Sequence, residues 1–289
     1  MNDTSFATQT HVYFKKISRI SLREKSWKYL IFAFIISFVV AIFVGPDMFR
    51  SFEQTNTAYF ALTSACIWIG IFNSVQSVCK EHEIIRAEYR QGMRISSYVV
   101  AHVLWQALLC LAQTIVIFVV CIIWMKFQNY GSSSLFISVY VANFLTIYLL
   151  ALGAAVLGLM ISSISGTPTT AMTVMPFILI VQLVLSGVLF QLKGASEILS
   201  YFTFSRWGMC AFGSEANLNA IPTKVVNLLT QRFGPQMVAQ MGGVPNALAT
   251  KLYDHTTLNL LGAWGGCLAL TALNIAISII ALKLKNRDS

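Results

Sequence analysis

The chain has 289 residues, of which 56% are hydrophobic and 11% charged, and its mean hydropathy is +0.69. A soluble domain carries roughly 25% charged residues, so this composition excludes an ordinary soluble enzyme. A helix needs about 20 apolar residues to cross a bilayer, so most of the chain is expected to be membrane helix. The net charge of +9 indicates attraction to anionic membrane lipids rather than a nucleic-acid partner.

Residues 1–28 form a predicted cytoplasmic arm. Apolar side chains recur on one helical face, and basic side chains surround them; the two sets are Tyr13, Ile17, Ile20 and Trp27, and Lys15, Lys16, Arg19 and Arg23. This pattern is typical of an amphipathic helix that lies in the membrane interface.

Six apolar segments are then predicted to span the membrane, within a domain of residues 29–282. They are Tyr29–Val44, Ala58–Val78, Tyr98–Met125, Leu135–Ile161, Ala171–Phe190 and Leu258–Leu282. Lysine and arginine gather before the first segment, between the second and third, and after the last, in the tail 283–289. The positive-inside rule therefore predicts a multi-pass protein of the cell membrane, all-α, with both termini in the cytoplasm.

The loop 79–97 lies within a strongly charged run, "CKEHEIIRAEYRQGMRISSYVV", residues 79–100. Acids and bases alternate over neighbouring turns, and Ile84, Ile85 and Tyr89 supply an apolar stripe. One interpretation is a solvated loop whose basic residues fix the topology. A docking surface for a soluble partner also explains the retained acids; its candidate residues are Glu81, Glu83, Arg86, Glu88, Arg90 and Arg94.

Polar side chains also occur inside the predicted spans. They are Asn73, Gln76, His102, Gln106, Gln113, Asn143, Gln182 and Asn274. Such groups are expected to face the bundle interior, where they either join helices by hydrogen bonds or line a pathway. The span interiors contain no Asp or Glu, which disfavours an ion-coupled transporter. The four histidines lie in different compartments, so neither a metal site nor a catalytic site is predicted.

The long segment 191–257 is predicted to form a small external cap. "TKVVNLLTQRF" and "PQMVAQM" have the pattern of short amphipathic helices separated by Gly234 and Pro235. Cys210 is the one cysteine of this segment, so it has no external partner in the chain. A free buried thiol and a cross-link between subunits both remain open.

Three stretches resemble a known family. "EYRQGMRISSYVVAHVL", residues 88–104, resembles the segment that enters the third span of the G subfamily of ABC transporters and of the related bacterial ABC-2 type permeases. "LSGVLF", residues 185–190, resembles the end of that family's fifth span, and "LSYFTFSRWGMCAFGSEANLN", residues 199–219, resembles its external re-entrant segment. The resemblance covers nearly the whole chain, and it rests on the order of these motifs together with the predicted topology.

The resemblance implies a half-channel: two permease subunits, alike or different, form an ATP-driven export pathway. Each docks an ABC ATPase subunit through the amphipathic helix and the loop between the second and third spans. The sequence contains no G-x-x-x-x-G-K-[ST] phosphate loop. We therefore expect that the chain is not an enzyme and that it binds no cofactor itself. The partner ATPase is expected to hold ATP and Mg. A truncated copy of a fused transporter is an alternative.

In the resembled family, the second and fifth spans of both subunits wall the substrate cavity. This nominates Trp68, Phe72, Asn73, Gln76, Met175, Phe177 and Gln182. Val188 and Leu189 align with an apolar gate, although lipid-facing aliphatic residues would give the same pattern. Such a cavity suits a hydrophobic or amphipathic substrate, such as a lipid, a peptide or a drug. A non-transporting membrane receptor or immunity protein built on the same fold is the alternative function.

Overall fold

The computed structural model describes residues 5–24, 27–44, 48–49, 51–124, 135, 137–190, 192–233 and 250–287. Throughout these ranges the regular secondary structure is helical, as predicted. The helices are α1 (Phe6–Arg23), α2 (Lys28–Val44), α3 (Phe52–Ser74), η2 (Cys79–Glu81), α4 (His82–Arg90), α5 (Ile95–Trp124), α6 (Val139–Ile164), α7 (Pro168–Val184), α8 (Ala195–Ser200), α9 (Phe204–Glu215), η3 (Leu218–Ala220), α10 (Ile221–Phe233), η4 (Lys251–Tyr253) and α12 (Thr257–Arg287).

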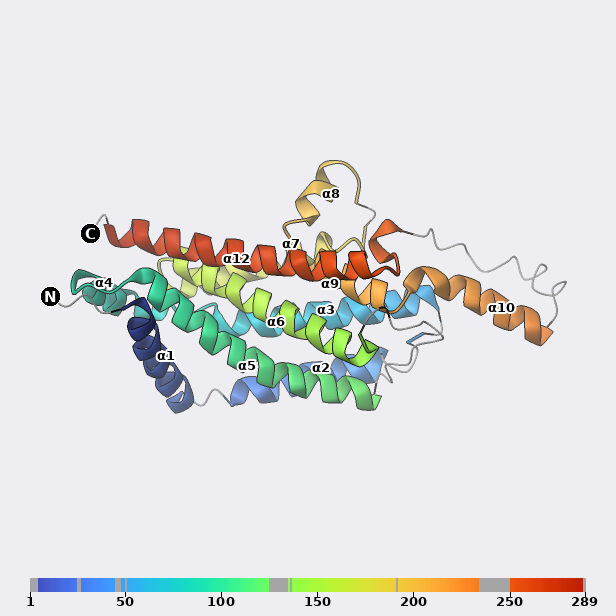
Figure 1. The fold of residues 1–289 in the computed structure, drawn as a ribbon, viewed down its shortest axis with the longest axis horizontal. Helices are drawn as coiled ribbons and strands as arrows, with labels where there is room; N and C mark the ends of the chain where they lie inside the picture. Colours follow the sequence, from blue (N-terminus) through green and yellow to red (C-terminus); the bar gives the residue numbers. More distant parts are fainter. Residues whose placement is uncertain are drawn as a thin grey trace.

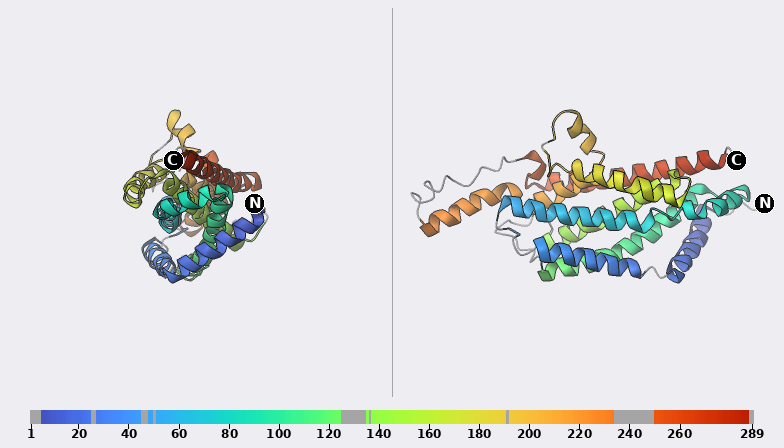
Figure 2. Two further views of the ribbon diagram at one scale, coloured as in Figure 1. Left: turned by 90° about the vertical axis from the view of Figure 1, so that its left-hand side faces the viewer. Right: turned by 180° about the vertical axis from the view of Figure 1, so that it is seen from behind.

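The long helices run side by side in an elongated bundle, and α1 lies at an angle to them at one end (Figure 1). The end of α12 lies at that same end, and α10 extends from the opposite end. Figure 2 shows that α8 projects from the side of the bundle. The shared end of α1 and α12 agrees with the prediction that both termini lie on one side of the membrane.

Each predicted span coincides with a helix, namely α2, α3, α5, α6, α7 and α12. Among the described residues, α3 with its continuation to Arg90, α5, α6 and α12 are long and apolar enough to cross a membrane. Helices α1 and α2 pass this test only as a bent pair, and α7 is a shorter apolar helix of 17 residues. The crossings by α2 and α7 therefore stay predictions.

Both predicted ends of the second span differ from the ends of α3, because local hydrogen bonds, rather than hydropathy, fix where this helix begins and ends. Helix α3 begins at Phe52, six residues before the predicted Ala58, since the hydroxyl of Ser51 accepts a hydrogen bond from the backbone N–H of Gln54. It ends at Ser74 instead of Val78. The hydroxyl of Ser162 on α6 accepts hydrogen bonds from the backbone N–H groups of Val78 and Cys79, which holds the chain in a turn there.

Helices α3 and α6 form the centre of the bundle and approach each other backbone to backbone. A Cβ atom on Gly70 would collide with the carbonyl oxygen of Ala151, and one on Gly158 would lie 2.7 Å from the carbonyl oxygen of Ile71. The hydroxyl of Ser74 donates to the carbonyl of Ala155 across the same contact. Small residues therefore set the spacing of the two central helices.

The segment predicted as an external cap contains α8, α9, η3, α10 and η4. Helix α9 does not lie on the surface: it packs against α3, α6 and α12, and Phe204 and Phe212 are fully buried. Helix α10 matches the predicted helix "TKVVNLLTQRF", whereas "PQMVAQM" lies outside the described residues. All six cysteines are free and buried. Cys210 is thus a buried thiol within the subunit.

Candidate functional site

The charged run is anchored to the bundle by apolar side chains. Ile85 of α4 is fully buried against Met93, Tyr98 and the residues of α6 and α12 that surround it. Helix α4 ends in a turn at Gly92, whose φ of 96° suits glycine. The backbone N–H of Met93 donates to the carbonyl of Glu88 across this turn, so α4 is joined closely to the start of α5.

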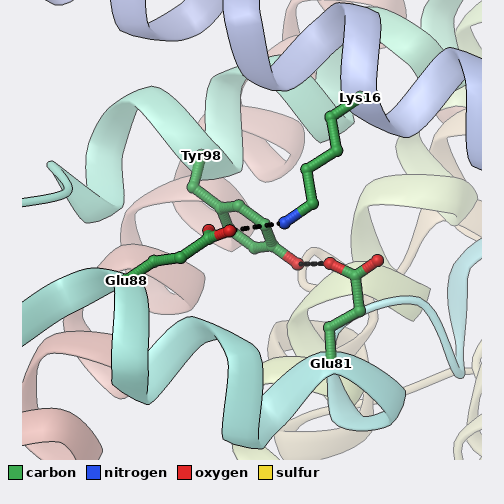
Figure 3. Close-up of polar contacts among 4 residues, drawn as sticks. All are labelled: Lys16, Glu81, Glu88 and Tyr98. Carbon is green, nitrogen blue, oxygen red and sulfur yellow. Dashed lines mark hydrogen bonds and ion pairs between the residues drawn. The ribbon is translucent and has the colours of Figure 1, made fainter. Parts of the chain in front are cut away.

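Helix α1 packs on α5 beside α4, although the two charged segments lie far apart in sequence. The ammonium group of Lys16 lies 2.7 Å from the Glu88 carboxylate (Figure 3). The ring of Tyr13 meets the ring of Tyr98 edge to face at 5.8 Å, and the indole N–H of Trp105 donates to the hydroxyl of Ser21. The predicted interfacial helix and the charged run therefore form one packed unit.

A second contact holds the beginning of the charged run. The hydroxyl of Tyr98 donates to the Glu81 carboxylate at 3.0 Å, and Figure 3 shows both acids turned toward α1 and α5. Tyr13 lies outside the predicted spans. Its pKa is raised to about 12, first by burial and then by the negative charge of Glu88. We name Lys16, Tyr98, Glu81 and Glu88 the coupling cluster.

The six candidate docking residues thus differ in orientation. Glu81 and Glu88 bind within the subunit. Arg86 is half-buried, and Glu83, Arg90 and Arg94 are exposed. With Lys80, which is also exposed, the outward charges of the run are therefore one acid and three bases.

The seven candidate cavity residues also separate into groups. Asn73 and Gln113 exchange two side-chain hydrogen bonds, of 2.7 and 3.1 Å, between α3 and α5. The side-chain oxygen of Gln182 accepts from the backbone N–H of Ser205 on α9, and Met175 is buried. These three candidates, Asn73, Met175 and Gln182, point into the subunit.

The aromatic candidates face outward. Trp68 and Phe72 on α3 are each 40% exposed, and Phe177 on α7 is 66% exposed. The rings of Trp68 and Phe72 lie 5.9 Å apart and form a continuous apolar surface. These are the positions that a second subunit or the lipid would cover.

A cavity of about 400 Å³, open to the surface of the subunit, lies between α1, α3 and α5, and Tyr29 of α2 and Met172 of α7 also border it. Phe72, Asn73 and Gln76 contribute to its wall, and so do His102 and Gln106 of α5. The sequence analysis identified the polarity of His102 and Gln106 but not that they border a cavity. The wall of this cavity is formed mainly by residues of three separate helices, α1, α3 and α5, so no spacing along the sequence could have revealed the cavity.

The candidate gate residues do not lie in a helix. Helix α7 ends at Val184, so the predicted end at Phe190 was wrong; Gly187 has a φ of 81°, which favours glycine and turns the chain. Val188 is partly buried against the core and its N–H donates to the hydroxyl of Ser186. Leu189 is exposed. The gate stays a prediction.

Glu215, at the end of α9, is a titratable residue that the sequence analysis did not select. It is 3% exposed, and neither carboxylate oxygen has a hydrogen-bond partner. Helix α9 is not among the candidate membrane spans. Burial raises the pKa of the Glu215 carboxyl from its ordinary 4.5 to about 7. Glu215 lies in the stretch 199–219 that resembles the family's external re-entrant segment. This position was the sequence signal that could have identified it.

Over the described ranges, no group of three or more His, Cys, Asp or Glu side chains is arranged to hold a metal ion. The candidate site consists of a charged unit at the end of the bundle where α1, α4 and α5 meet, a cavity with polar side chains in its wall, and outward aromatic side chains.

Comparison with known proteins gives one family. No individual curated protein matches the chain. The family model described as "ABC-2 type transporter" matches residues 12–213, which run from the middle of α1 through most of α9 and include Lys16, Glu81, Glu88 and Tyr98. The likeness to the G subfamily in particular stays a resemblance. The chain, an all-helical membrane permease in its composition and fold, belongs to the ABC-2 type transporter family.

Proposed function

We propose that the chain is the membrane subunit of an ATP-driven exporter, that it pairs with a second permease subunit, and that it docks a separate ATPase subunit at the charged run. Family membership supports a transporter permease. The observation that carries the docking proposal is the ion pair between Lys16 and Glu88, which unites α1 and α4. A soluble partner that pushes on either helix would move both.

The exposed residues define where the ATPase binds. Glu83, Arg90 and Arg94 project from the packed unit, whereas its apolar side is occupied by Ile85 and Met93. A surface of mixed charge suits a polar partner, because exposed charges steer association and fix its register. Glu81 and Glu88 have a different role in this proposal: they keep the docking surface attached to α1 and α5.

The same packing supports a route for the mechanical signal. Helix α4 is joined to α5 by the hydrogen-bonded turn at Gly92, and α5 contacts α1, α2 and α6. Packed helices move as units and do not deform continuously. A displacement of α4 by the closing ATPase would therefore reach the spans through α5.

The outward aromatic residues support a shared pathway. Trp68, Phe72 and Phe177 are large, exposed and apolar on α3 and α7, so a partner subunit would complete an apolar wall. Aromatic and aliphatic walls bind hydrophobic or amphipathic molecules well. The proposed cargo is accordingly a lipid, a peptide or a drug-like amphiphile, and the proposed location is the cell membrane with both termini in the cytoplasm.

The test is a pull-down of the tagged protein from its native membrane in mild detergent. The variant Glu83→Lys/Arg90→Glu/Arg94→Glu is compared with the wild type. A matched control, Lys193→Glu/Glu197→Lys/Lys251→Glu, reverses one acid and two bases at exposed positions elsewhere. We expect a nucleotide-binding protein to accompany the wild type and the control but not the test variant, with all three equally stable to heat.

Two outcomes contradict the proposal. If no ATPase accompanies the wild type under conditions that preserve its oligomer, the exporter function fails, and the membrane receptor or immunity function takes its place. If an ATPase binds all three proteins equally, the docking surface lies elsewhere.

A further inference from the structure

The internal cavity has an amphipathic wall. Its apolar side is built from Ile17 and Ile20 of α1, Phe72 of α3, and Trp105 and Leu109 of α5. Its polar side contains His102 and Gln106, and its rim contains Glu24, Lys80 and Glu81. Such a wall suits a molecule with an apolar body and a polar end.

Two polar side chains of the wall have unused hydrogen-bonding capacity. His102 is 4% exposed, and neither of its ring nitrogens has a partner. Gln106 is 3% exposed; its amide nitrogen donates to the carbonyl of Asn73, but its side-chain oxygen has no partner. Buried polar groups are normally satisfied, because an unpaired group costs about 1–3 kcal/mol. These three atoms are covered in this conformation, so a bound molecule would supply the missing partners after a small movement of the side chains that line the cavity.

The charges around the cavity do not select an ion. At the rim, Glu81 already accepts a hydrogen bond from Tyr98, and Lys80 stands beside it with the opposite charge. Lys16, the cation whose charge acts on His102, is paired with Glu88. Glu24 adds one acid at the exposed edge. The buried part of the wall therefore offers hydrogen bonds without a net charge.

The polar groups lie deeper than the lipid head groups. His102 and Gln106 lie seven and eleven residues after Ile95, where α5 begins, which is roughly 10 and 16 Å along the helix axis. Each head-group layer is about 5–8 Å thick, so with Ile95 at the membrane surface both groups lie at the depth of the acyl chains, where lipid itself offers a polar head no hydrogen-bond partners. Phe72, a candidate residue of the shared pathway, borders the same cavity.

We propose that this cavity binds the head group of an uncharged amphiphile, one that carries hydroxyl or amide groups, through His102 and Gln106. A hydroxyl both donates and accepts, as a neutral imidazole does, and an amide N–H can donate to the free oxygen of Gln106. The site lies within one subunit. As a loading site for cargo it rests on the proposed export function; as a binding site it does not.

The test uses three molecules with the same twelve-carbon tail. Monolaurin has a neutral glycerol head, dodecyltrimethylammonium a cationic head and dodecyl sulfate an anionic head. The protein is placed in phosphatidylcholine nanodiscs, and saturable binding of radiolabelled monolaurin is measured against empty nanodiscs, with the two charged molecules as competitors below micellar concentration. We expect saturable monolaurin binding that neither charged molecule displaces at equal concentration.

The variant His102→Phe/Gln106→Met removes the hydrogen-bonding groups and keeps much of their volume. Since these atoms have no partner in the subunit apart from the Gln106 contact with Asn73, the variant is expected to fold. Thr114→Val is the matched control: the Thr114 hydroxyl is also buried on α5 without a partner, but Thr114 does not border the cavity. We expect the double variant to bind monolaurin at least about tenfold more weakly and the control to bind it normally.

The proposal is overturned if monolaurin does not bind saturably, if the double variant binds it as well as the wild type, or if a charged molecule binds more tightly than monolaurin. None of these measurements uses ATP or an ATPase, so such a failure is separate from failure of the exporter function. With the ATPase present, a cargo would raise the rate of ATP hydrolysis in a His102-dependent way. A resident lipid would bind without changing that rate; either result supports the site.

Discussion

The ion pair between Lys16 and Glu88 predicts a measurable coupling between α1 and α4. Its atoms lie 2.7 Å apart, and the two side chains are 29% and 28% exposed. Fully exposed pairs contribute about 0.2–1 kcal/mol, whereas hydrogen bonds to charged groups contribute about 1.5–3 kcal/mol. For this partly screened pair we expect a coupling free energy of about 1 kcal/mol.

A double-mutant cycle isolates this value. Lys16→Met, Glu88→Gln and the double variant are compared with the wild type by thermal unfolding of the purified protein. Each single variant is expected to lower Tm by about 2–4 °C, and the double variant by less than the sum, because the first substitution already removes the pair. The difference between variants should shrink at high salt.

Two matched controls test whether charge alone explains the effect. Lys15→Met removes a neighbouring exposed base from α1, and Glu83→Gln removes an exposed acid from α4. Both are expected to change Tm by less than 1 °C, since surface charges contribute little. Strictly additive effects of Lys16→Met and Glu88→Gln would refute the conclusion that this pair joins the two helices.

Three further predictions concern the core and α9. Gly158→Ala should destabilise the protein by about 1–3 kcal/mol, because the added methyl group meets the carbonyl of Ile71. Gly166→Ala is the control, because nothing lies within 4 Å of a Cβ atom there. Equal Tm values for the two variants would contradict the close approach of α3 and α6. Asn73→Leu should cost about 1–3 kcal/mol, because it removes the donor to the buried side-chain oxygen of Gln113, whose amide nitrogen keeps its bond to the carbonyl of Tyr29; adding Gln113→Leu should recover part of this loss of Tm. Because the folded-state pKa of Glu215 is about 7 against an ordinary 4.5, its ionisation costs nothing below pH 4.5, destabilises the fold increasingly between pH 4.5 and 7, and reaches its full cost above pH 7. Glu215→Gln should therefore raise stability by up to about 3 kcal/mol at pH 8 and leave it nearly unchanged at pH 4.5; an equal gain in Tm at both values would refute the buried carboxylate.

Hydropathy and periodicity were sufficient to locate the six long apolar helices and to assign the chain to the class of membrane proteins. The six apolar segments coincide with six helices, because burial in lipid demands long apolar runs and internally satisfied backbone groups whatever the tertiary contacts. The amphipathic pattern from Tyr13 to Trp27 likewise predicted a helix at the position of α1, but α1 ends at Arg23, so Trp27 lies outside it. Helix ends were less predictable: the boundary at Ser74 depends on Ser162, a residue of another helix.

The orientation of the polar side chains was decided only by the tertiary structure. Sequence grouped Glu83 and Glu88 together in one charged run, but Glu88 turns inward because Lys16, 72 residues earlier, meets it there. The same holds for Asn73, which was assigned to a pathway between subunits; its side chain is paired with Gln113 inside the subunit, where it also borders the cavity between α1, α3 and α5. The sequence alone determined which segments are apolar enough to enter a membrane, since hydrophobic transfer is a property of each segment. Which polar groups are paired, and that His102 and Gln106 border a cavity, depends on three-dimensional contacts between helices and could be decided only by the fold.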